Sequence, residues 1–164
     1  DWYWRKSELM AVEKVKEYLR TYHMEERILE FDVSSATVEL AAQALGVDGC
    51  RIAKTLSFKI DDGAILILAA GDARIDNKKF KETFHTKAKM LSPDEVENLV
   101  GHAIGGVCPF GINDGVKTYL DTSLKRFETV FPAVGSSSSA VEMSIDELEK
   151  YSQGFVGWVD VCKL

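Results

Sequence analysis

Lys54 stands inside an alternating apolar pattern, where a charged side chain needs a chemical reason. Within residues 51–60, Ile52, Leu56 and Phe58 fall on the same strand face as Lys54. Lysine is rarely buried without a partner, because losing water destabilises its ammonium and lowers its pKa. Either the side chain extends past a sheet edge into water, or this face opens into a pocket that needs positive charge.

A glycine-rich segment over 101–111 offers a second kind of chemistry. It contains Gly105 and Gly106, which let the backbone approach a ligand closely, and Pro109, which stiffens the turn. Free N–H groups in such a loop can bind a carbonyl or phosphate oxygen, as an oxyanion hole does. The alternative is a tight turn between two elements.

Cysteine and histidine raise a third possibility. Cys108 follows His102 in the same segment, so a thiol nucleophile with a histidine base is one interpretation, and a small apolar side chain is the other. The three cysteines are widely spaced, as are the three histidines, so we expect neither a disulfide framework nor a metal site. This cysteine usage favours a reducing compartment.

Composition sets outer limits on function. The 164 residues predict one domain, and 46% hydrophobic with 28% charged residues is typical of a globular protein. A net charge of -6 argues against broad nucleic-acid binding but allows a local basic site, for which the lysines at 78, 79, 81, 87 and 89 are candidates. A solvated helix face is the alternative for those lysines. With no membrane-spanning run and no signal-peptide pattern, we expect a cytoplasmic protein.

The elements that must position these residues can be predicted from periodicity and capping signals. We expect helices over 7–24, 34–45, 76–84, 92–101 and 144–151, with Ser34-Ser35 as a cap and capping boxes at Ser92 and Ser144. Strands are expected over 28–31, 51–60, 64–70, 116–121, 129–134, 140–143 and 155–161, with a hairpin turn at 61–63. Local hairpins with scattered helices favour an α+β domain with a mixed or barrel-like sheet.

In their order and spacing, these motifs resemble the YbaK-type family, and also the editing domain inserted in bacterial prolyl-tRNA synthetases. The resemblance rests on segments 52–58, 105–111, 119–124, 135–136 and 141–143, with the helix over 36–47, and it covers about residues 28–162. It implies a compact α+β domain around a curved, barrel-like mixed sheet, with no metal or organic cofactor. Residues 27–164 would form the editing domain, and 1–26 an N-terminal helix belonging to it.

The resemblance implies trans-editing, the hydrolysis of the ester in a mischarged aminoacyl-tRNA. The expected substrate is tRNA(Pro) carrying Ala, Cys, Ser or Thr, and the expected partners are the tRNA acceptor end and prolyl-tRNA synthetase. A non-catalytic module that binds aminoacyl-tRNA or a synthetase is the alternative.

The implied catalytic residues are Lys54, Gly105 and Pro109. The implied substrate-binding residues are Phe31, Thr55, Gly106, Val107, Cys108, Gly135, Ser136 and Glu142. Lys54 would supply charge for the terminal phosphate or the ester region, and the loop N–H groups would hold the ester oxygen. No protein nucleophile stands out, so water or a group on the substrate is expected to attack. Thr55 should point to the opposite face from Lys54, and Glu142 could equally form a structural salt bridge.

Overall fold

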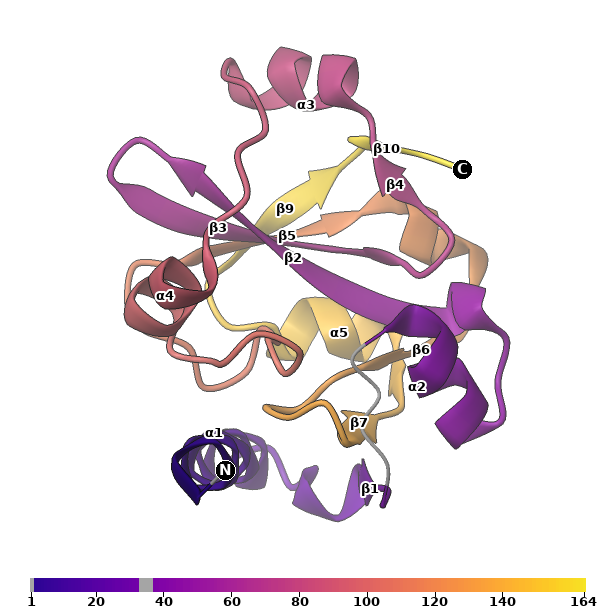
Figure 1. Cartoon of the computed structure of the whole chain (residues 1–164). Helices are drawn as coiled ribbons and strands as arrows, with labels where there is room; N and C mark the ends of the chain where they lie inside the picture. Colours follow the sequence, from indigo (N-terminus) through magenta and orange to yellow (C-terminus); the bar gives the residue numbers. More distant parts are fainter. Residues whose placement is uncertain (1, 33–36) are drawn as a thin grey trace.

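The computed structural model describes residues 2–32 and 37–164 of the chain. Its centre is a six-stranded sheet in the order β8-β6-β2-β3-β5-β9, in which parallel and antiparallel pairs are mixed (Figure 1). The strands are β2 (Ile52–Ile60), β3 (Gly63–Ala70), β5 (Lys117–Asp121), β6 (Thr129–Pro132), β8 (Met143–Ser144) and β9 (Phe155–Val159). This is the single-domain α+β architecture with a curled mixed sheet that the sequence predicted.

Two separate two-stranded antiparallel sheets accompany the central sheet. β1 (Ile28–Glu30) pairs with β7 (Ser139–Val141), and β4 (Arg74–Ile75) pairs with β10 (Cys162–Lys163). The predicted hairpin is confirmed, because β2 and β3 are antiparallel and Ile60 is the partner of Gly63. Every β3 residue after Gly63 is buried, so this hairpin forms the centre of the core.

Five α-helices surround the sheet in the described part of the chain. They are α1 (Trp2–Arg20), α2 (Val38–Leu45), α3 (Asn77–Phe84), α4 (Pro93–Glu95) and α5 (Ile145–Tyr151). In the view of Figure 1, α3 lies above the sheet, and α1, α2 and α5 lie below it. No helix in the described residues combines the length and apolar composition needed to cross a membrane.

The helix boundaries follow their capping residues. Both predicted capping boxes are present, with Ser92 accepting from Glu95 N and Ser144 accepting from Glu147 N. Thr37 caps α2 by accepting from Leu40 N, whereas the predicted cap at 34–35 lies outside the described residues. The helix predicted over 92–101 is α4 followed by a turn of π-helix, Val96–Val100.

α1 packs backbone to backbone against two glycines of distant loops. A Cβ atom added at Gly135 would lie 2.9 Å from the carbonyl oxygen of Ala11, and one at Gly111 would lie 3.2 Å from that of Lys14. Both glycines have positive φ, which side-chain-bearing residues rarely adopt. The first helix therefore contacts the loops that build the site described next.

Candidate functional site

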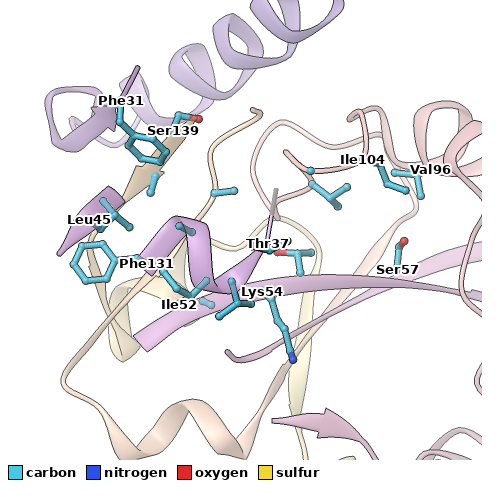
Figure 2. Close-up of a pocket in the computed structure, with 18 of the residues that line it drawn as sticks. Phe31, Thr37, Leu45, Ile52, Lys54, Ser57, Val96, Ile104, Phe131 and Ser139 are labelled. Atoms are coloured by element: carbon cyan, nitrogen blue, oxygen red, sulfur yellow. The ribbon is translucent and has the colours of Figure 1, made fainter. Parts of the chain in front are cut away.

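A cavity of about 220 Å³ lies between α2, β2, β6 and the segment 90–107 (Figure 2). It is smaller than the pockets that hold drug-sized ligands, and it suits a small group such as an aminoacyl moiety. Its walls are mainly apolar, formed by Phe31, Val38, Ala41, Leu45, Ile52, Ala53, Met90, Leu91, Val96, Ile104, Val107, Phe131, Ala133 and Ala140. Lys54, Thr37, Thr55, Ser57, Gly105 and Ser139 complete the lining.

The pocket lies mainly on the Thr55 face of β2, although Ile52 and Lys54 of the other face also line it. Ala53, Thr55 and Ser57 alternate along the strand and all line the cavity. On the opposite face Phe58 packs against Phe80 of α3, with ring centroids 5.0 Å apart. The sequence placed the pocket on the Lys54 face, because alternation separates two faces without showing what covers each one.

Lys54 lines the pocket, but its ammonium is held elsewhere. Nζ donates to the carbonyl oxygens of Gly71, at 3.4 Å, and of Ala73. Figure 2 shows the side chain leading away from the other labelled residues. Burial lowers the pKa of Lys54, and the charge of Asp72 opposes that shift. Asp72 is itself bound by Arg126 through two hydrogen bonds of 3.0 and 2.6 Å.

The glycine-rich loop presents two free amides at the cavity wall. Gly105 and Val107 line the pocket, and within the described residues their N–H groups have no hydrogen-bond partner. Between them Gly106 is fixed, since its N–H donates to Ala103 O and its carbonyl accepts from Gly135 N, both at 3.1 Å. The loop can therefore offer N–H groups to an oxygen atom without losing other bonds.

Cys108 and Pro109 belong to the same glycine-rich segment but do not line the cavity. Pro109 O accepts from Gln153 N at 2.8 Å. The Cys108 side chain is fully buried, with its sulfur 3.6 Å from His102 Nε2, and that nitrogen is 2.8 Å from Phe110 O. Burial raises the pKa of Cys108 to about 12 and lowers that of His102 to about 4, so both are neutral at pH 7. This supports the apolar interpretation of Cys108 over the nucleophile.

Alkylation with iodoacetamide tests this arrangement. We expect Cys50, which is partly exposed, to be modified first in the folded protein. Cys108 should react only in denaturant, because it is inaccessible and almost entirely in the thiol form. Peptide mass spectrometry at several times reports both sites, and rapid native labelling of Cys108 would revive the thiol nucleophile.

The remaining predicted site residues are divided between the cavity and its surroundings. Phe31 lines the cavity. Ser136 does not; its hydroxyl lies 2.8 Å from that of Ser139, which does. Glu142 lies outside the lining and forms the salt bridge that was the alternative from sequence, accepting from Arg51 at 3.1 Å and from Thr129 at 2.6 Å. Gly135 acts as a spacer between α1 and Gly106.

Among the polar groups of the cavity, sequence reasoning named Thr55 but missed Ser57, Thr37 and Ser139. Thr55 Oγ1 is buried and has no hydrogen-bond partner among the described residues. Ser57 is only 6% exposed, and its hydroxyl likewise has no partner there. The signal was present as two hydroxyl residues at alternate strand positions, but nothing local indicated that α2 and the segment 90–107 would cover them.

Comparison with known proteins gives consistent matches. A family model described as an aminoacyl-tRNA editing domain matches residues 32–151. An uncharacterized protein of Bacillus subtilis, YwhH, is 54% identical over 155 residues, covering 94% of this chain and 98% of that protein. A proline–tRNA ligase of Caldicellulosiruptor bescii is 30% identical over 90 residues, covering 54% of this chain but only 15% of the ligase.

A solved structure shares the fold over nearly its full length. It is described as that of a candidate trans-editing enzyme for prolyl-tRNA synthetase, and it aligns with a TM-score of 0.84 and 30% identity. The alignment covers 94% of this chain and 98% of the other.

Proposed function

This chain belongs to the aminoacyl-tRNA editing domain family, and from that premise we propose that it is an aminoacyl-tRNA deacylase. The substrate is a mischarged tRNA, tRNA(Pro) carrying Ala, Cys, Ser or Thr, and the reaction is hydrolysis of the ester at its 3′ end. The observation that carries this proposal is the pair of free loop amides, Gly105 and Val107, on the wall of a small apolar cavity.

The cavity holds the amino acid and the loop stabilises the reacting carbonyl. Attack by water, or by a hydroxyl or thiol of the substrate, places negative charge on the ester oxygen. N–H groups of Gly105 and Val107 donate to that oxygen as the charge develops, which lowers the barrier. The C–O bond to the ribose then breaks, and the ribose oxygen takes the proton that the nucleophile loses. Attack by water releases the free amino acid directly, whereas attack by a substrate hydroxyl or thiol gives a new ester or thioester that water then hydrolyses. The Thr55 hydroxyl, which is buried without a partner among the described residues, becomes a further polar contact for the substrate once its side chain rotates toward the cavity.

Lys54 is proposed to act on the terminal phosphate of the tRNA. Its ammonium reaches that position only after it leaves the carbonyls of Gly71 and Ala73. Burial favours such a move, because it destabilises the charged form where it now lies. A compact ammonium on a flexible stem is well suited to binding a phosphate.

The tRNA acceptor end and a prolyl-tRNA synthetase are the proposed partners, in the cytoplasm. Lys78, Lys81, Lys87 and Lys89 are exposed and supply local positive charge, whereas Lys79 pairs with Asp160 at 3.1 Å. The net charge of -6 favours weak intrinsic tRNA affinity, with the synthetase supplying the remainder. Tight tRNA binding by the isolated protein at physiological salt would contradict this.

We propose that residues 1–26 belong to the same unit as the editing domain over 27–164, which the contacts of α1 with Gly111 and Gly135 support.

Deacylation of Ala-, Cys-, Ser- and Thr-tRNA(Pro), with Pro-tRNA(Pro) as the control, tests the function. We expect the wild type to hydrolyse at least one mischarged species and to spare the cognate one. Lys54→Ala should lower kcat/KM by roughly tenfold to a hundredfold, because one charged contact to the phosphate is lost. Lys59→Ala is the matched control, since Lys59 lies on the same strand, pairs with Glu95 and does not line the cavity.

Failure of the folded wild type to hydrolyse any of these species would contradict the deacylase. Charged tRNA bound without turnover would then identify the non-catalytic module.

A further inference from the structure

The Ser57 hydroxyl is a polar group built into an apolar wall with nothing in the protein to bind. The residue is 6% exposed and lines the cavity, and no described residue hydrogen-bonds to its hydroxyl. Figure 2 shows the hydroxyl directed toward the side of the cavity where Val96 and Ile104 lie. The hydroxyl has no partner among the described residues and opens onto the cavity, so a ligand group that pairs with it gains a hydrogen bond on binding.

Ser57 is one of two such groups on the same strand face. Thr55 is two positions earlier, which separates the two side chains by roughly 7 Å along the strand. Thr55 Oγ1 has almost no accessible surface and meets a ligand only after its side chain rotates, whereas the Ser57 hydroxyl is open to a ligand in the cavity. The surrounding walls are mainly apolar, so these two hydroxyls contribute much of the cavity's preference between polar and apolar substrate groups.

We propose that Ser57 reads the side chain of the aminoacyl group, and that the preferred substrates carry a β-hydroxyl, as seryl- and threonyl-tRNA do. The proposal rests on the proposed function, because it assigns the side-chain end of the same cavity. A β-hydroxyl both donates and accepts, which matches the capacity of the serine hydroxyl. The apolar side chains of Val96 and Ile104 accommodate the extra methyl group of threonine.

The same contact disfavours the other aminoacyl groups. Alanine and proline have no side-chain donor or acceptor, so binding either one leaves the Ser57 hydroxyl buried and unpaired. A cysteine thiol is a weak donor and a weak acceptor. Sites that hydrogen-bond a substrate hydroxyl reject the analogue without it far better than apolar sites reject an added hydroxyl. Ser57 thereby helps to spare the cognate prolyl ester.

The experiment compares kcat/KM for pairs of esters that differ in one hydroxyl. Ser-tRNA(Pro) is paired with Ala-tRNA(Pro), and Thr-tRNA(Pro) with the isosteric Val-tRNA(Pro), so that the two pairs separate a serine from a threonine preference. We expect the wild type to favour the hydroxylated member of at least one pair, and Ser57→Ala to reduce that ratio by about tenfold or more.

Ser152→Ala is the matched control. Ser152 is 5% exposed, its hydroxyl has no partner among the described residues, and it lies outside the cavity lining. Its substitution should leave both ratios unchanged. Thermal melting should show Ser57→Ala at least as stable as the wild type, because the substitution removes a hydroxyl with no partner. Reduced selectivity could then not be attributed to unfolding.

A wild-type preference for Ala over Ser and for Val over Thr would overturn the inference and leave the deacylase function intact. A preference that survives Ser57→Ala unchanged would do the same. If no ester is hydrolysed, the proposed function fails, and binding of 3′-seryl-amino- and 3′-alanyl-amino-adenosine, which carry an amide in place of the ester, still tests Ser57. Equal affinity of the wild type for these two analogues overturns the inference; preference for the seryl analogue, lost in Ser57→Ala, supports it.

Discussion

Gly106→Ala is expected to lower the single-turnover deacylation rate by about a hundredfold or more, with a smaller effect on substrate binding. The added Cβ atom would lie 2.4 Å from the Gly135 carbonyl carbon and 2.5 Å from both its oxygen and Ser136 N. All three atoms belong to the backbone, so no side chain can rotate aside and the loop itself must move. The free amides of Gly105 and Val107 flank this position and would move with it.

The size of that effect follows from the geometry of oxyanion stabilisation. Loss of one oxyanion-hole donor costs about 10²–10³ in kcat in enzymes where it has been removed. Because the charge forms only in the transition state, the loss should be in kcat more than in KM. Gly157→Ala is the control, since nothing lies within 4 Å of its added Cβ and its φ is not positive. A folded Gly106→Ala protein with wild-type kcat would show that these amides do not act on the ester.

Asp121→Ala is expected to reduce the free energy of unfolding by about 3–5 kcal/mol. The carboxylate is 1% exposed, and it accepts from Ser123 N and from Val161 N, each at 2.9 Å. Alanine would leave both N–H groups without an acceptor, and hydrogen bonds to a charged group contribute more than neutral ones. Asp121 therefore caps the turn that follows β5 and links it to the C-terminal segment.

Urea denaturation measures this effect through the shift in midpoint at constant m value. A loss of this size is a large part of the stability of a typical domain. Asp62→Ala is the control, because Asp62 is exposed in the hairpin turn and its substitution should change stability by no more than about 0.5 kcal/mol. Equal effects of the two substitutions would show that the buried hydrogen bonds contribute little. Asp121→Asn, which keeps an acceptor oxygen, should fall between them.

The parts of the fold that local signals specify were predicted well. Ser92 and Ser144 each form the capping box that their spacing with a later glutamate indicates. The hairpin after Ile60 follows from its turn residues, and the apolar run of β3 is buried as expected. These features depend on residues within a few positions of each other, so one sequence is enough to read them.

The features that were not predicted depend on contacts between distant segments. Alternation in β2 separated Lys54 from Thr55, but the cover that makes the Thr55 face a pocket comes from α2 and the segment 90–107. Similarly, the spacing of Cys108 and His102 left two interpretations open, a thiol nucleophile and an apolar side chain, and only their burial, which keeps both neutral, favours the second. Burial and long-range contacts decide whether a cysteine, histidine or lysine is reactive in the folded protein, and neither can be predicted from sequence spacing.

The contact of α1 with Gly135 also bears on the order in which this protein matures during synthesis. The helix leaves the ribosome early, whereas Gly111 and Gly135, on which its backbone rests, are translated much later. Gly135 in turn fixes Gly106, so the glycine-rich loop reaches its final shape only once three widely separated segments have met. Nascent chains that end before this point carry the loop residues without the packing that orders them. The deacylase activity that we propose is therefore expected only after this late step, and shorter nascent chains are expected to lack it.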